Sequence, residues 1–254
     1  MPPATTRSKP EPRLSRPARV AEEIKDWVVE QGLQPGDRLP GEAELMARFD
    51  MAKGTIREAM RILEAQGLIK TRTGPGGGAF VHEVSRARAK ALLGNYFYFK
   101  DLTVGDIYQL RRALEPELAA SLAGTLPEEV LEALEANIAR YSEPAKSLDE
   151  EREQHVASLE FHAILAEQSG NALLSFVIGF MVKLLADLTV HRQLYDPINR
   201  DLWSNGRDYQ ERLVMALRAG DSGAARAVMK AHMDTAWRLM RGQEVEMMKR
   251  FIDE

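Results

Sequence analysis

The first informative pattern along the chain is a run of apolar residues at helical spacing near the N-terminus. Val20, Ile24 and Trp27 lie three or four positions apart, which predicts a helix that begins near Arg16. Gly32, followed by further glycine and proline, marks its end.

Two shorter helical patterns follow. Residues 42–49 place Leu45 and Phe49 on one side, and residues 54–66 repeat this pattern up to Gly67, a glycine suited to a left-handed helix cap. The connection between them is short. We therefore expect a helix-turn-helix.

A β-hairpin is predicted directly after it. Residues 68–72 alternate and are rich in branched side chains, residues 74–78 are mostly glycine, and residues 79–82 form a second short apolar run. This order is typical of a winged helix-turn-helix, in which the second helix of the pair enters the major groove of DNA and the hairpin approaches the phosphate backbone.

The remainder of the chain is helical in pattern and contains no second hairpin signal. Short connections between successive helices favour an antiparallel all-α bundle of six or seven helices. The fold class is therefore mainly α, with a flexible basic arm at 1–15, the winged module at 16–84 and the helical domain at 85–254. The expected helices cover residues 85–99, 104–124, 127–141, 148–169, 171–195, 200–219 and 221–249.

Charge is distributed unevenly along the 254 residues, whose net charge is −4. Residues 1–82 carry a net charge of +2 and the remainder −6. The first 20 residues hold five basic side chains among five prolines, which suits either an arm that lies near a polyanion or a solvated tail.

The composition limits which metal sites, covalent links and cellular compartments are expected for this chain. The absence of cysteine excludes disulfides and thiolate metal sites. The longest apolar stretch, 172–190, is interrupted by Lys183 and Asp187, so we expect no membrane span. No secretory signal is evident at the N-terminus, and a cytoplasmic protein is expected.

Two long motifs resemble the GntR family of bacterial transcription regulators, in its FadR-type subfamily with an all-helical C-terminal ligand domain. They are Leu-Pro-Gly-Glu-Ala-Glu-Leu at 39–45 and Lys-Gly-Thr-Ile-Arg-Glu-Ala-Met-Arg-Ile-Leu-Glu-Ala-Gln-Gly-Leu-Ile at 53–69. The resemblance implies a homodimeric repressor that binds a palindromic double-stranded operator under the control of a small organic-acid effector. Looser similarity continues through residues 110–115, 160–162, 169–171, 217–221 and 231–233.

The resemblance also implies which residues contact DNA. Departures from the family pattern limit the inference, because Gly41 replaces a frequent serine, Ala43 a frequent arginine, and Lys53 a frequent arginine. Lysine cannot pair bidentately with guanine as arginine does, so the operator is expected to differ. The alternative is that the helix residues form only a solvated face. The implied contacts are Lys53, Thr55 and Arg57 on the helix and Arg72, Gly76 and Gly77 on the hairpin.

The resemblance places Ser158, His162, Gln210 and His232 where many members of the subfamily hold a metal with one aspartate and three histidines. Two of those four ligands are replaced, so His162 and His232 would hold a divalent metal only weakly. The alternative is a buried, hydrogen-bonded histidine pair that lines a polar cavity. His155, about 10 Å along the helix from His162, is poorly placed to share one ion.

Arg111 is the other residue that the resemblance places near the effector pocket. A guanidinium there suits a carboxylate, which it binds through two hydrogen bonds. The alternative is an exposed pair with Glu115, four residues later on the same helix. Without the aspartate, the pocket is expected to be electropositive or neutral.

Two other functions remain open. One is a metal-dependent helical-bundle enzyme that uses Glu160, His162 and His232, although no Glu-x-x-His pair is repeated on two helices. The other is a metal-sensing regulator without an organic effector, against which the incomplete ligand set counts.

Overall fold

A computed structural model describes residues 14–100 and 102–253 of the chain. The chain forms two compact units, of which the first ends at Ala89 and the second begins at Lys90. The predicted basic arm at 1–15 lies almost entirely outside the described residues.

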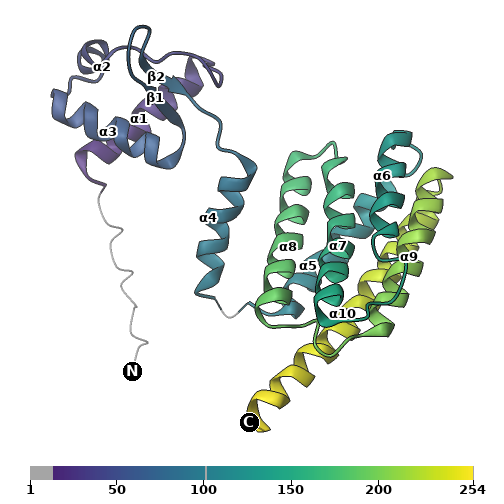
Figure 1. The fold of residues 1–254 in the computed structure, drawn as a ribbon. Coiled ribbons are helices and arrows are strands. Elements are labelled where there is room, and N and C mark those ends of the chain that lie inside the picture. Colours follow the sequence, from purple (N-terminus) through teal and green to yellow (C-terminus); the bar gives the residue numbers. More distant parts are fainter. Residues whose placement is uncertain (1–13, 101, 254) are drawn as a thin grey trace, which may run out of the picture. The chain divides into compact units, whose positions relative to one another are not determined.

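The first unit contains three helices, α1 (Arg16–Glu30), α2 (Glu42–Phe49) and α3 (Lys53–Gln66), shown in Figure 1. Ser15 caps α1 by accepting a hydrogen bond from the backbone of Ala18, whereas Gly41 gives α2 no side-chain cap. The apolar faces of the three helices meet in one core, so the helical periodicity of the sequence correctly identified the buried faces. Its fully buried members are Val20, Ala21, Ile24, Leu39, Leu45, Ile56, Ala59, Leu63 and Ile69.

The hairpin follows α3 directly. Gly67 ends the helix in the left-handed conformation with φ of 83°, as its position predicts. Strands β1 (Ile69–Arg72) and β2 (Gly78–Val81) are antiparallel, with Arg72 opposite Gly78. This hairpin is the wing of a winged helix-turn-helix.

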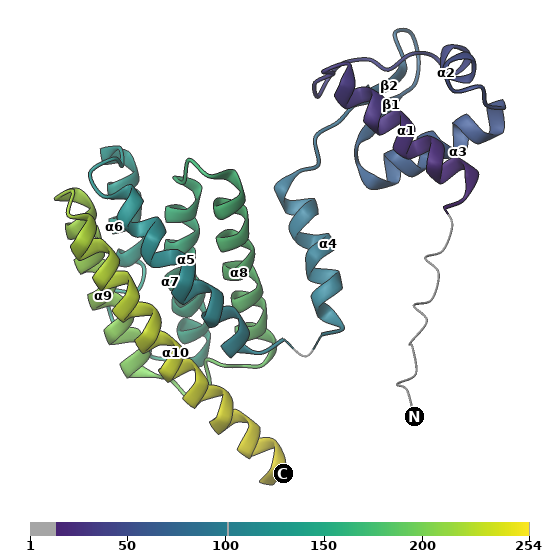
Figure 2. The same ribbon diagram turned by 180° about the vertical axis from the view of Figure 1, so that it is seen from behind.

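The second unit is a helical bundle, seen from two sides in Figures 1 and 2. Helix α10 packs along α5 and α9, and α7 packs against α8 and α6. The apolar sides of these helices form one continuous core. Helix α4 (Arg86–Tyr98) begins in the first unit and ends in the second. The helices of the bundle, α5 to α10, are Val104–Leu122, Glu128–Ala139, Leu148–Glu167, Ala172–His191, Arg200–Arg218 and Ser222–Asp253.

The predicted fold class is confirmed, and the differences lie at helix ends. The helix expected to reach residue 195 stops at His191, because Gln193 takes a positive φ of 51° that a helix does not allow. The last helix extends to Asp253, four residues beyond the expected end.

Among the described residues, α8 is the one helix long and apolar enough to cross a membrane by length and composition alone. Lys183 and Asp187 within this stretch had predicted no such segment. A core helix of a bundle passes the same test. Ile178, Met181 and Leu185 of α8 are buried among the neighbouring helices.

Candidate functional site

The predicted recognition residues lie in the first two turns of α3. Lys53 and Arg57 are well exposed, with 62% and 64% of their side chains accessible, and Thr55 is partly buried. Both cations form ion pairs with Glu42, which begins α2. The structure therefore places Lys53 and Arg57, one turn apart, on one exposed surface, whereas Thr55 lies two positions from each and points to another side of the helix. The contact of all three residues with DNA stays a prediction.

The predicted wing residues lie at the hairpin and its tip. The guanidinium of the exposed Arg72 lies 4.7 Å from the ring centre of Phe80 on the facing strand. Gly77 cannot carry a side chain, since a Cβ there would lie 2.6 Å from the carbonyl oxygen of Arg72. Arg38 donates a hydrogen bond of 2.6 Å to the Gly77 carbonyl, a contact that the sequence pattern did not predict.

The second unit contains a cavity of about 50 Å³ between its helices. Its walls come from α5, α7, α9, α10 and the segment after α6, and they combine aromatic and aliphatic side chains with several polar ones. The residues with polar groups include Tyr108, Arg111, Tyr141, Glu151, Gln154, His155, Ser158, His162, Trp203 and His232.

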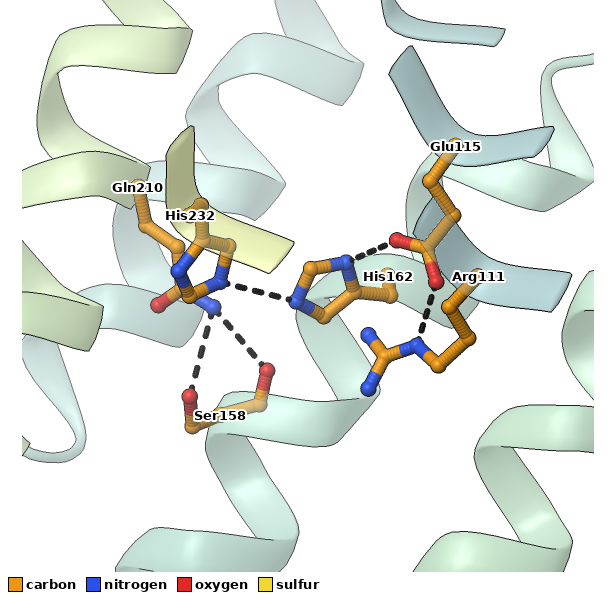
Figure 3. Close-up of polar contacts among 6 residues, drawn as sticks. All are labelled: Arg111, Glu115, Ser158, His162, Gln210 and His232. Carbon is orange, nitrogen blue, oxygen red and sulfur yellow. Dashed lines mark hydrogen bonds and ion pairs between the residues drawn. The ribbon is translucent and has the colours of Figure 1, made fainter. Parts of the chain in front are cut away.

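Three of these residues, Arg111, His162 and His232, form one chain of polar contacts with the buried Glu115, drawn in Figure 3. Arg111 donates from Nε to Glu115 Oε1 over 2.5 Å. Glu115 Oε2 lies 2.5 Å from His162 Nδ1, and His162 Nε2 lies 3.2 Å from His232 Nε2. None of the four is more than 5% exposed.

The chain of contacts fixes where the protons lie when both imidazoles are neutral. An ionised carboxylate only accepts, so His162 donates from Nδ1 to Glu115. Its Nε2 then accepts, and His232 must donate from its own Nε2. The Nδ1 atom of His232 is consequently left as an acceptor.

Burial governs the ionisation of this network. Burial lowers the pKa of His162 and lowers that of His232 strongly, the latter with help from His162. Burial by itself would raise the pKa of the Glu115 carboxyl, but Arg111 and His162 outweigh it and hold that pKa well below its usual range. The network is therefore an ion pair followed by two neutral imidazoles.

The two residues that replace family ligands bond to each other. Gln210 donates from Nε2 to the Ser158 carbonyl over 3.0 Å and lies 3.3 Å from Ser158 Oγ. Its Oε1 accepts a 2.7 Å hydrogen bond from the Tyr141 hydroxyl. Figure 3 shows that the amide nitrogen, and not the oxygen, faces Ser158. Gln210 is thus held away from the role of an oxygen ligand.

This arrangement does not fit a tightly held metal. Within residues 14–100 and 102–253, no group of three or more histidine, cysteine, aspartate or glutamate side chains is placed to hold an ion. The two imidazoles that remain are hydrogen-bonded to each other. The described side chains match the alternative of a buried histidine pair that lines a polar cavity.

Arg111 lines the cavity and also pairs with Glu115, so features of both interpretations are present. It forms the pair with Glu115, but the expectation of a solvated face is wrong, because both side chains are only 1% exposed. Its Nη2 atom is buried without a hydrogen-bond partner. A buried, unpaired guanidinium nitrogen at a cavity wall is costly unless a ligand satisfies it.

Of the two charge states expected for the cavity, electropositive or neutral, its side chains correspond to the neutral one. Glu115 neutralises Arg111, and Glu151 adds a carboxylate to the wall, where burial raises its pKa. His155 lines the same cavity even though it cannot share an ion with His162. Of the predicted effector residues, Gln210 alone stands behind the wall and does not line it.

The sequence pattern did not identify Glu115 as a buried partner of Arg111, nor Tyr141, Glu151 and Gln154 as cavity residues. A signal for Glu115 was present. Tyr108 and Leu118 occupy the same helical stripe as Arg111 and Glu115, and all four are buried. Apolar residues on both sides of a charged pair, at helical spacing, indicate that the pair faces the core.

Comparisons with known proteins agree with this architecture. Residues 17–81 match the model described as bacterial regulatory proteins, gntR family, and residues 106–235 match the FCD domain. The chain is 26% identical to proteins named HTH-type transcriptional repressor NanR. One is from Citrobacter rodentium, over 244 residues, and one from Escherichia coli K12, over 249, each match covering 90% of this chain and 86% of the relative.

A solved structure shares the fold. The Streptococcus agalactiae GntR structure aligns with a TM-score of 0.61 at 22% identity, covering 87% of this chain and 99% of that one. The family and the named relatives are transcription regulators, which excludes the enzyme alternative. The chain belongs to the GntR family, as a DNA-binding transcription regulator with an FCD domain that binds a small-molecule effector.

Proposed function

We propose that the protein is a homodimeric repressor that acts in the cytoplasm and binds a palindromic operator through α3 and the wing. Occupation of the cavity by a small organic acid would change its affinity for that operator. Two copies are needed because one recognition helix contacts too few base pairs for useful specificity. The relatives are named as repressors, which supports repression over activation for this protein.

The observation that carries the effector class is the unpaired Nη2 of Arg111. One guanidinium nitrogen is committed to Glu115, and Nη2, buried and unpaired, is available to a ligand. A carboxylate is the group that satisfies such a donor most strongly. The cavity of about 50 Å³ is a third of the ~150 Å³ that encloses benzene in an apolar site. A short acid therefore fits better than a long one.

Binding of an acid would also involve the histidines. An anion next to a neutral imidazole favours its protonation. When both imidazoles are neutral, Nδ1 of His232 is the acceptor that can take up a proton. We expect the protein to take up protons as it binds the acid. Calorimetric titrations with acetate, lactate and pyruvate in buffers of different ionisation enthalpy measure that uptake.

The central test compares neighbouring arginines in the full chain. Arg111→Ala should remove the effect of the acids on the unfolding temperature and on operator binding, because truncating one partner of a desolvated charge pair costs ~2–5 kcal/mol. The control is Arg112→Ala, since Arg112 pairs with Asp234 at a surface where it is 40% exposed. Arg112→Ala should respond as the wild type does.

A second variant separates ligand binding from folding. Arg111→Met combined with Glu115→Gln removes both charges together, which avoids an isolated buried carboxylate. If this protein folds and still responds to the acids, Arg111 does not bind them. If no acid shifts the wild type, the proposed effector class is wrong.

A further inference from the structure

A single carboxylate contacts two of the residues predicted to read DNA. Glu42 Oε1 lies 2.9 Å from Arg57 Nε, and Glu42 Oε2 lies 3.5 Å from Lys53 Nζ. Glu42 begins α2, whereas Lys53 and Arg57 lie on α3. We propose that Glu42 is a positioning residue that sets the DNA specificity of this protein, an inference that rests on the predicted contacts of α3.

The fold sets the backbone position of Glu42. Glu42 is the first residue of α2, and Leu45, one turn later, is buried in the core of the unit. A carboxylate at the start of a helix is also favoured by the helix dipole. The carboxylate therefore extends toward α3 from a helix whose place is set by the core, in contrast to a glutamate on a loop.

Which nitrogen of Arg57 binds Glu42 matters for base recognition, and it is Nε. An arginine reads guanine by directing two N–H groups at O6 and N7. With Nε bound to Glu42, the terminal Nη1 and Nη2 groups of Arg57 are the pair that remains for a base. Arg57 is 64% exposed despite the contact, so its outer end is accessible. An anchored arginine also loses less conformational freedom when DNA binds.

The same carboxylate weakens contacts that carry no sequence information. Glu42 offsets one of the two positive charges at the start of α3, and phosphate affinity increases with the number of cations that replace counterions. Its negative charge also repels phosphate. Glu42 should therefore lower the affinity for random DNA while it improves the orientation of Arg57 toward a base.

Stability does not explain these contacts. Glu42, Lys53 and Arg57 are 37%, 62% and 64% exposed, and ion pairs at such exposure contribute little to folding. Glu42→Gln should consequently fold like the wild type. This makes binding measurements on the variant interpretable.

The test uses the full chain and two DNA duplexes. One duplex is selected from a random library by the wild-type protein, and the other has the same length and a scrambled sequence. For Glu42→Gln we expect tighter binding of the scrambled duplex, a salt dependence steeper by up to about 0.9 in log–log slope, and a specificity ratio about tenfold lower.

The matched control is Glu44→Gln, which removes the same charge from the first turn of the same helix. It should leave the specificity ratio unchanged. In an Arg57→Ala background, Glu42→Gln should no longer alter the ratio, because it acts through Arg57. A ratio that is unchanged in Glu42→Gln, or lowered equally in Glu44→Gln, would overturn the inference.

The controls also separate this inference from the assignment of α3. If Arg57→Ala alone leaves binding of the selected duplex unchanged, the predicted contact itself is wrong. If Arg57→Ala weakens binding and Glu42→Gln keeps the ratio, only the role of Glu42 fails.

Discussion

The two units use the same pair of residue types in opposite ways. In the first unit, Glu42 and Arg57 form an ion pair at a surface where they are 37% and 64% exposed. In the second unit, Glu115 and Arg111 form an ion pair that is 1% exposed on both sides. The first pair can exchange with water or DNA at little cost, whereas the second is locked by desolvation.

This difference shows how each unit meets its ligand. A DNA-binding surface needs cations that remain hydrated and available, because the polyanion arrives from solvent and displaces counterions. An effector cavity needs polar groups that are held in one arrangement before the ligand enters. Exposure suits the first task and burial the second.

The sharpest test of this contrast removes the glutamate from each pair. Glu115→Ala leaves Arg111 and His162 without their carboxylate, and it should lower the free energy of unfolding by about 3–5 kcal/mol. Glu42→Ala should change it by less than about 1 kcal/mol. Urea denaturation of both full-length variants measures the difference. Equal losses would show that burial does not separate the two pairs.

A second test converts the buried network into a metal site. Ser158→Asp with Gln210→His restores the ligand set that the family resemblance implies, and the double variant should retain one zinc ion per chain after dialysis. Zinc at 1,000 times its Kd should then stabilise the protein by about 4 kcal/mol. Adding His232→Ala should abolish the gain, and the wild type should show none.

A double variant that gains no metal would contradict the predicted ligand positions. Positions 158 and 210 would then not face His162 and His232 as ligands do, although Gln210 and Ser158 lie within hydrogen-bond distance of each other. The family correspondence at these positions would be wrong.

A third test addresses the exposed cations. Arg57→Ala should weaken binding of the selected duplex by about 1–3 kcal/mol without changing the unfolding temperature, since an exposed side chain is removed. Lys53→Ala should weaken all sequences alike and make the salt slope shallower by about 0.9 if it contacts only phosphate. Fluorescence anisotropy over a salt series separates the two. Loss of binding together with unfolding would refute the comparison.

The smallest expected effect is a pH dependence confined to the helical unit. Burial lowers the pKa of His155 to about 4, and burial also lowers those of His162 and His232. Such histidines bind protons more readily when unfolded, so the free energy of unfolding falls as the pH drops from about 6.5 toward 4. His155 alone should account for a loss of about 1–2 kcal/mol between pH 7 and pH 5.

The measurement follows tryptophan emission in a Trp27→Phe background, which restricts the signal to the helical unit. Glu151 acts in the opposite direction, since burial raises its pKa. His82 is the one histidine among the described residues of the first unit, and it is exposed. Unfolding that is insensitive to pH, or stronger at pH 5, would contradict the burial of the histidines.

The sequence by itself determined the local elements and the family. The spacing of Val20, Ile24 and Trp27 identified α1, and Gly67 marked the end of α3, because helix periodicity and glycine conformation depend on neighbouring residues alone. The long motif around the third helix identified the family, and with it the fold class.

The tertiary structure decided which polar groups meet. The i,i+4 spacing put Arg111 and Glu115 on one face of a helix, but whether that face meets solvent or the core depends on how all the helices pack. Glu115 contacts His162 across 47 positions of the chain, and Gln210 contacts Ser158 across 52. Periodicity specifies neighbours within a helix, whereas contacts between helices follow from the burial of all their apolar faces together.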